Sequence, residues 1–140
     1  MSPTGSEIVI DASALVRGVV VGEPQAVEWV ERIALRDVQG IAPDHVYVEV
    51  ANSLRGYLRA RWIEADAADE RISAVLDLPL TTFPSRLLAR QALGLTQTRG
   101  VSAYDGLYLA LALGFGARLV TADRRLATAA GDAAVLLPPV

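Results

Sequence analysis

Residues 7–11 read Glu-Ile-Val-Ile-Asp, a short apolar run that ends in a carboxylate. Such a run predicts a strand buried on both faces, as in a parallel sheet that has helices on each side. Residues 119–123, Leu-Val-Thr-Ala-Asp, repeat this arrangement near the other end of the chain. Ligands bind beyond the carboxyl ends of the strands in such sheets. We therefore expect Asp11 and Asp123 at the edge of the sheet where a site would form.

Short apolar runs alternate with segments of helical periodicity along the chain. Strands are predicted at residues 7–11, 40–42, 79–83, 118–121 and 134–137. Helices are predicted at residues 13–21, 25–36, 44–63, 66–78, 85–95, 102–113 and 124–130. The helix at 102–113 is apolar nearly all round and should be buried. The alternation predicts an α/β fold with a mainly parallel sheet, in one domain of 140 residues.

The composition narrows the possible chemistry. Cysteine is absent, all 13 basic residues are arginine, and His45 is the single histidine. These facts exclude disulfides, thiol nucleophiles and P-loop or Schiff-base lysines, and they argue against a histidine-based triad. Hydrolysis would have to depend on carboxylates, hydroxyls or a metal ion that they hold. The net charge of −3 does not indicate a general nucleic-acid binder, although arginine suits bidentate phosphate contacts.

The same features indicate a cytoplasmic protein. Residues 1–6 have neither the basic region nor the apolar core of a secretory signal. The longest apolar run, residues 107–113, is far shorter than the roughly 20 residues of a membrane-spanning helix.

Three acidic residues lie at predicted element boundaries, and each has two interpretations. Asp11 and Asp123 follow strands and precede helices, where aspartate is a common N-cap. Asp105 stands three residues after Ser102, the spacing of a capping box in which its carboxylate reaches back to the Ser102 amide. Each of them could instead face a site, and the sequence leaves both interpretations open.

Glu49 is the fourth acid of interest. It lies beyond the edge of the apolar arc of the predicted helix 44–63, beside Asn52, Ser53 and Gly56. These small polar neighbours leave room for a carboxylate to face a cleft, but an ordinary solvated glutamate would fit the pattern as well. If the four acids converge, they repel one another unless a cation joins them, and oxygen ligands select Mg²⁺ or Mn²⁺.

Four segments make the pattern recognisable: residues 8–16 (IVIDASALV), 46–55 (VYVEVANSLR), 102–112 (SAYDGLYLALA) and 119–127 (LVTADRRLA). They resemble the four signatures of PIN-domain ribonucleases, and in particular the VapC-type toxins of bacterial toxin–antitoxin pairs. The likeness extends over about residues 7–137. It implies a three-layer α/β/α sandwich around a mainly parallel sheet of about five strands.

The resemblance also implies a site and a function. Asp11 and Asp105 match the principal metal ligands of the family, and Glu49 and Asp123 match the acids that bind metal or orient water. Ser13 and Thr121 match hydroxyl positions that support the pocket. The implied activity is that of a Mg²⁺- or Mn²⁺-dependent endoribonuclease, which forms a homodimer and is silenced by a cognate antitoxin. Arg17, Arg99 and Arg124 lie near the motifs and are candidates for contacts with RNA phosphates.

Two other functions compete with this interpretation. A phosphohydrolase or phosphoacceptor domain would need a second nearby aspartate and a lysine, which the chain lacks. A non-catalytic PIN-fold module that only binds RNA or a protein stays open.

Smaller features receive structural interpretations. His45 is interpreted as a polar residue near a helix start without a ligand role, and Trp29 and Trp62 as packing residues. Gly106 stands where the family more often has alanine, and glycine within a helix costs about 1 kcal/mol relative to alanine.

Overall fold

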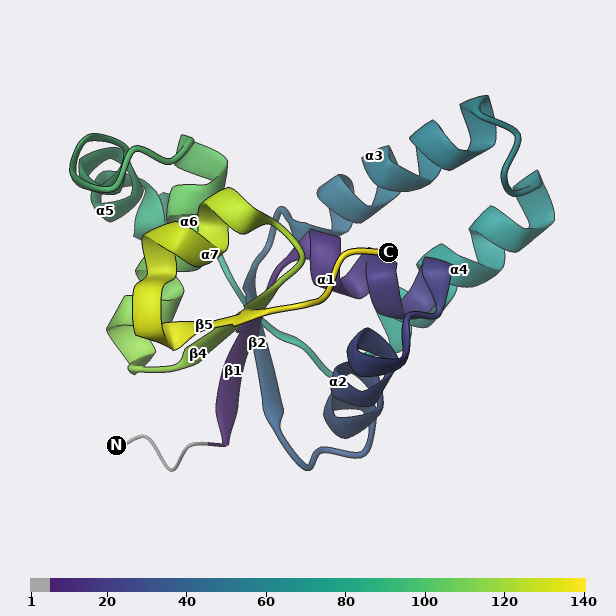
Figure 1. Ribbon diagram of the computed structural model, residues 1–140, viewed down its shortest axis with the longest axis horizontal. Helices are drawn as coiled ribbons and strands as arrows, with labels where there is room; N and C mark the ends of the chain where they lie inside the picture. The colour runs from purple at the N-terminus through teal and green to yellow at the C-terminus, as the bar shows by residue number, and fades with distance from the viewer. Residues whose placement is uncertain (1–5) are drawn as a thin grey trace.

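The computed structural model describes residues 6–140 as a central sheet between two groups of helices (Figure 1). Residues 1–5, on which the expectation about a secretory signal largely falls, lie outside the described residues. Within residues 6–140, no helix is long and apolar enough to cross a membrane.

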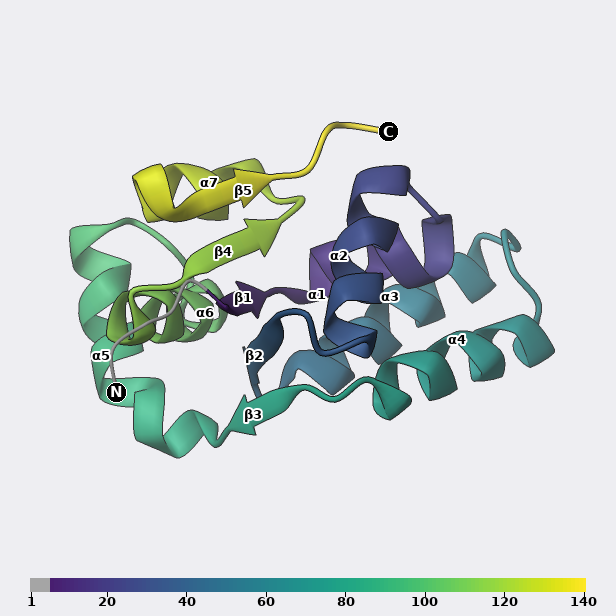
Figure 2. The same ribbon diagram turned by 90° about the horizontal axis from the view of Figure 1, so that it is seen from below.

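Five parallel strands form the sheet in the order β3-β2-β1-β4-β5. Their bounds are β1 (Glu7–Ile10), β2 (Gln39–Pro43), β3 (Thr81–Phe83), β4 (Arg118–Thr121) and β5 (Ala134–Leu136). Figure 2 shows the strands from the β3 edge to the β5 edge. The chain builds one half of the sheet outward from β1 and then returns to build the other half from β4. The strand order therefore reverses between β1 and β4, and this is where ligands bind in open parallel sheets.

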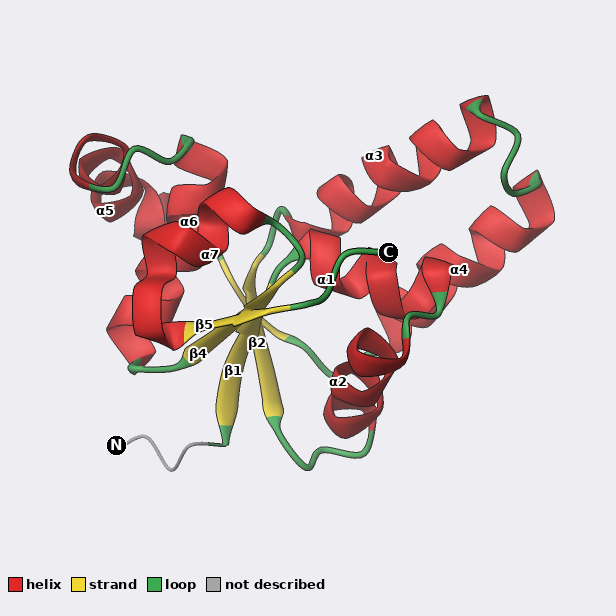
Figure 3. Cartoon of the chain, in the orientation of Figure 1, coloured by secondary structure: helices red, strands yellow, loops and turns green. Residues whose placement is uncertain are grey.

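The helices lie on both faces of the sheet, in three layers (Figure 3). They are α1 (Ala12–Val16), the π-helix η1 (Arg17–Val21), α2 (Pro24–Ala34), α3 (Val46–Arg59), α4 (Ala65–Asp77), α5 (Ser85–Thr98), α6 (Ala103–Phe115), α7 (Arg124–Ala130) and the short 3₁₀ helix η2 (Gly131–Ala133). In Figure 3, α5, α6 and α7 are grouped on one side of the strands and α1 to α4 on the other. The predicted α/β sandwich with a parallel five-stranded sheet is confirmed.

Burial explains why the apolar runs form these elements. Ile8, Val9 and Ile10 are fully buried in β1, and every residue from 106 to 112 of α6 is buried, as its apolar circumference predicts. Trp29 packs against the core, with the guanidinium of Arg32 over its ring at 4.6 Å. The packing prediction is wrong for Trp62, which is 73% exposed because it lies in the connection between α3 and α4, beyond the sheet.

Several predicted boundaries need correction. The predicted helix 44–63 ends at Arg59, and Arg61 then takes a left-handed conformation with φ 60°. The predicted helix 102–113 continues through Gly114 to Phe115, because the left-handed cap is Gly116, with φ 59°. The predicted helix 13–21 is a short α-helix followed by a π-helix, and it ends at Gly22 as the sequence indicates.

Gly106 allows α6 to approach α5 closely. A Cβ placed on Gly106 would lie 2.9 Å from the carbonyl oxygen of Ala92 and 3.2 Å from its Cα. Backbone atoms cannot move aside as the end of a flexible side chain can. This packing explains why the chain has glycine where alanine would favour the helix.

We expect Gly106→Ala to lower the melting temperature, although alanine is the better helix former. Overpacking costs about 1–3 kcal/mol and outweighs a gain of about 1 kcal/mol in helix propensity. Gly114→Ala on the same helix is the matched control, since nothing lies within 4 Å of a Cβ placed there. This control should melt about 2–8 °C higher than the wild type. Thermal melts of the three proteins test the expectation, and equal gains for both variants would contradict it.

Candidate active site

Asp11 lies at the carboxyl end of β1 and is the N-cap of α1. The residue is only 5% exposed, and both of its carboxylate oxygens accept hydrogen bonds. Oδ1 accepts from the Ser13 hydroxyl at 2.7 Å and from the Ala14 amide at 2.9 Å. Oδ2 accepts from the Thr121 hydroxyl at 2.6 Å. Asp11 is thus both a helix cap and the buried floor of a site.

The hydroxyls of Ser13 and Thr121 join the ends of β1 and β4. They lie 3.3 Å apart. The Ser13 hydroxyl accepts from the Ala122 amide at 2.9 Å, and the Thr121 hydroxyl accepts from the Asp123 amide at 2.9 Å. The loop that carries Asp123 is therefore fixed relative to Asp11. This is the support expected of these two hydroxyls.

Asp123 and Asp105 also lie at the starts of helices. Asp123 is the N-cap of α7, and its Oδ1 accepts from the amides of Arg125 at 2.8 Å and Leu126 at 3.3 Å. At α6 the cap is Ser102, whose hydroxyl accepts from the Asp105 amide at 3.1 Å. The backbone of Asp105 thus completes this half of the capping box, and its carboxylate lines a pocket.

Glu49 is more than a solvated residue of α3. Its Oε1 accepts a hydrogen bond from the Tyr108 hydroxyl at 2.7 Å and lies 2.9 Å from Nε2 of His45. The sequence interpretation missed both neighbours. A signal was present, because His45 precedes Glu49 by four residues and Tyr108 follows Asp105 by three, spacings that share a helix face.

A pocket of about 240 Å³ brings the four acids together at the carboxyl end of the sheet. Its lining comes from α1, α3, α6 and the start of α7, and comprises Asp11, Ala12, Ser13, Glu49, Asn52, Ser53, Asp105, Tyr108 and Asp123. Asn52 and Ser53 are the small neighbours that the sequence places beside Glu49. No three histidine or acidic side chains among residues 6–140 are arranged as a ready-made metal site. We call this space the acid pocket.

The acids act on one another electrostatically. Burial raises the pKa of Asp11 to about 6, and the charge of Asp105 adds to the rise, whereas the bonds from Thr121, Ser13 and Ala14 oppose it. Burial also raises the pKa of Asp105, followed by the charges of Asp123 and Glu49, while His45 opposes the rise. The carboxylates are therefore close enough to repel one another.

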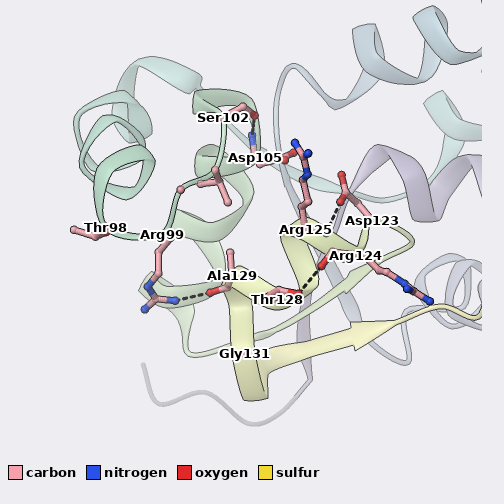
Figure 4. A pocket seen from close by; sticks show the side chains of 12 residues that line it. Thr98, Arg99, Ser102, Asp105, Asp123, Arg124, Arg125, Thr128, Ala129 and Gly131 are labelled. Atoms are coloured by element: carbon pink, nitrogen blue, oxygen red, sulfur yellow. Dashed lines mark hydrogen bonds between the residues drawn. The ribbon is translucent and has the colours of Figure 1, made fainter.

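A second, wider pocket of about 870 Å³ shares Asp105 and Asp123 with the acid pocket. Figure 4 shows its walls, the α5–α6 connection and α7. Three arginines line it: Arg99, Arg124 and Arg125. We call this space the arginine groove. Arg99 is anchored there because its Nη1 donates to the Ala129 carbonyl at 2.5 Å.

Arg17 lies elsewhere. It lines neither the acid pocket nor the arginine groove, and its Nη1 donates to the Pro138 carbonyl at 2.6 Å. The structure therefore supports Arg99 and Arg124 as residues beside the acids, but not Arg17. Arg125 was missed, although it lies next to Arg124 in the fourth motif.

A model of the PIN domain matches residues 8–132. The chain belongs to the PIN-domain family. Two curated relatives of this PIN domain are ribonucleases by name. Ribonuclease VapC12 of Mycobacterium tuberculosis is 33% identical over 124 residues, which cover 89% of this chain and 92% of that protein. Ribonuclease VapC3 of Pyrobaculum aerophilum is 30% identical over 123 residues, 86% of this chain and 92% of that protein.

Two solved structures share the fold. The crystal structure of PAE2754 from Pyrobaculum aerophilum gives a TM-score of 0.73 at 23% identity and covers 96% of this chain and 86% of that one. The crystal structure of FitAcB from Neisseria gonorrhoeae gives a TM-score of 0.57 at 20% identity, with 93% and 96% covered. The predicted likeness to VapC-type PIN ribonucleases is confirmed by the family match and the curated relatives.

In EDTA, we expect Asp11→Asn to become more stable relative to wild type as the pH rises. The carboxyl of Asp11 binds its proton more tightly in the folded protein, with pKa about 6 against 3.8. Its favourable contribution to folding is complete below pH 3.8 and is lost as the pH rises through about 6. From below pH 3.8 to pH 7.5 the wild type should lose roughly 3 kcal/mol relative to the variant, at 1.36 kcal/mol per pKa unit, and about 2 kcal/mol of this change falls between pH 4.5 and pH 7.5.

Urea unfolding of both proteins at pH 4.5 and pH 7.5 measures this difference. Asparagine can still accept from the Ala14 amide, so the α1 cap is retained. A difference in unfolding free energy that stays the same at both pH values would contradict the expectation.

Proposed function

We propose that this PIN domain is a divalent-metal-dependent endoribonuclease and the toxin of a toxin–antitoxin pair. The observation that carries the proposal is the acid pocket, where Asp11, Glu49, Asp105 and Asp123 line one space at the point where the strand order reverses. Relatives named as ribonucleases support the reaction class. A non-catalytic PIN-fold module that only binds RNA or a protein would not need four carboxylates that repel one another in one pocket.

The donor set of the acid pocket fits Mg²⁺ or Mn²⁺. All four acids offer hard oxygen ligands, and their repulsion would be relieved by a cation. Asp11 and Asp105 are the proposed principal ligands, because they match the principal metal ligands of the family and both line the acid pocket. Glu49 and Asp123 complete the acidic set. A bound ion would supply charge neutralisation at the phosphate and lower the pKa of water.

The remaining chemistry belongs to the chain's own side chains. Glu49 or Asp123 orients a water and takes its proton as the water oxygen bonds to phosphorus. The bond from phosphorus to the 3′ oxygen breaks, and that oxygen is protonated from solvent. The products carry 5′-phosphate and 3′-hydroxyl ends. Hydroxyl bonds from Ser13 and Thr121 keep Asp11 in place throughout.

The arginine groove suits the RNA strand on one side of the cleaved bond. Arg99, Arg124 and Arg125 are exposed there, beside Asp105 and Asp123. Planar guanidinium groups bind phosphates bidentately, and phosphate contacts position a strand without reading its sequence. These residues would also offset the repulsion between RNA and the acids.

The proposal includes partners that the VapC-type resemblance implies. These are a cognate antitoxin that silences the enzyme and a second copy of the chain in a homodimer. The cytoplasmic location also remains a prediction. Co-expression with a small protein encoded by a neighbouring gene, followed by co-purification and measurement of the mass of the complex, tests the antitoxin and the dimer together.

Asp105→Asn should abolish RNA cleavage and leave the protein folded. Asparagine is nearly isosteric with aspartate but is a poor ligand for Mg²⁺, and the bond to Ser102 uses the backbone amide, which the substitution keeps. The matched control is Asp66→Asn, another acid in the first turn of a helix, on α4. Cleavage of labelled RNA with Mg²⁺ is the measurement. Near wild-type cleavage by Asp105→Asn would show that Asp105 is a structural residue only.

Saturating Mn²⁺ should raise the melting temperature of the wild type above its value in EDTA. A ligand that binds only the folded state adds about 2.7 kcal/mol at 100 times its dissociation constant, or roughly 5–15 °C for a domain of this size. Asp11→Asn should lose most of this increment, and Asp66→Asn should keep it. Equal melting temperatures of the wild type in both buffers would contradict a metal site.

A further inference from the structure

Glu49 is held by side chains from two elements. The Tyr108 hydroxyl on α6 donates to Oε1 at 2.7 Å, and Nε2 of His45, at the start of α3, lies 2.9 Å from the same atom. No hydrogen bond to Oε2 was found within the described part of the chain. Both neighbours therefore contact the same oxygen of the carboxylate, Tyr108 by a hydrogen bond and His45 at ion-pair distance, and leave the other oxygen available to the acid pocket.

Tyr108 is a rigidly packed residue that supports Glu49. The residue is 1% exposed, so core packing fixes its ring while its hydroxyl reaches the pocket wall. Burial, followed by the charge of Glu49, raises the pKa of Tyr108, and the phenol therefore stays protonated and can only donate to Glu49. A distance of 2.7 Å is in the range of a charge-assisted bond to a carboxylate.

His45 supports the same arrangement. Its ring centroid lies 5.2 Å from that of Tyr108, and both of its ring nitrogens are buried without a hydrogen-bond partner in the described structure. A buried imidazole that forms no hydrogen bond lowers the free energy of unfolding, so its retention calls for an explanation. Its Nε2 lies 2.9 Å from Glu49 Oε1, which is an ion-pair distance without the geometry of a hydrogen bond, so the ring limits the space on that side of the carboxylate.

We propose that Tyr108 and His45 are positioning residues that fix Glu49 through Oε1, so that Oε2 orients the attacking water. The inference rests on the proposed function, and it assigns Glu49 to water rather than to direct metal ligation. Asp11 is only 5% exposed and forms the buried floor of the pocket, whereas Glu49 lies at its more open side. The Glu49 side chain is also 34% exposed and can reach solvent water.

The first test compares two tyrosine variants on α6. Tyr108→Phe removes only the hydroxyl and keeps the packed ring, and we expect kcat to fall about 10-fold or more because the water is no longer held in line. KM should stay within about 2-fold, and the Mn²⁺-induced rise in melting temperature should be unchanged, because RNA and metal binding use other residues. Tyr104→Phe is the matched control, since Tyr104 is 67% exposed.

The second test asks whether Tyr108 acts through Glu49. Tyr108→Phe should lower kcat in the wild-type background but add no further loss in the Glu49→Ala background. A role in folding alone would give the same fractional loss in both backgrounds. His45→Asn should lower kcat in the wild type and likewise add nothing to Glu49→Ala.

Melting temperatures in EDTA test the contact between Tyr108 and Glu49 independently of activity. They are measured for the wild type, Tyr108→Phe, Glu49→Ala and the double variant. The loss for the Tyr108→Phe, Glu49→Ala double variant should be smaller than the sum of the single losses. Independent losses, or wild-type kcat for Tyr108→Phe, would overturn the inference. A loss of the Mn²⁺-induced rise in Tyr108→Phe would also overturn it and make Glu49 a metal ligand. Failure of the wild type to cleave RNA would instead contradict the proposed function. The melting temperatures in EDTA would still decide whether Tyr108 and Glu49 stabilise each other.

Discussion

The repulsion among four carboxylates at one end of the sheet is the constraint on which the rest of this structure depends. Asp11, Glu49, Asp105 and Asp123 come from four separate segments and line one pocket of about 240 Å³. Burial and neighbouring charges raise the pKa values of Asp11 and Asp105, so gathering these groups costs folding free energy. The buried strands and the apolar helix α6 supply the stability that offsets this cost.

Three of the four acids are held by different sets of hydrogen-bond donors. Asp11 is held by two hydroxyls and an amide, Asp123 caps α7 with its carboxylate, and Glu49 is held by a phenol and faces an imidazole. The bonds to Asp11 join β1 to β4 across the point where the strand order reverses. For Asp11 and Asp123, the helix-cap role is compatible with a place in the pocket, because capping the helix fixes the carboxylate beside the pocket.

The sequence predicts the strands well because strands that are buried on both faces appear as short, continuous apolar runs. The predicted strand at 118–121 and helix at 124–130 have the bounds found in the structure. Errors fall where tertiary contacts or backbone conformation decide, as at Gly114, which α6 passes through, and at Trp62, which lies outside the core. The four acids were identified from their motifs, whereas the contact between Tyr108 and Glu49 joins residues 59 positions apart, and the only sign of it in the sequence is that Tyr108 shares a helix face with Asp105.

In the proposed nuclease, the acid pocket would hold the reacting groups rigidly and the arginine groove would bind the strand more loosely. Asp11 and Tyr108 are buried, and their hydrogen bonds leave them little freedom, as the proposed reaction at a phosphate would require. Arg124 and Arg125 are exposed on the first turn of α7, where long side chains can follow a flexible strand. Asp105 and Asp123 border both spaces, so the arginines lie beside the carboxylates that would repel RNA. In the proposed function these arginines would offset that repulsion, which a pocket of acids alone could not do.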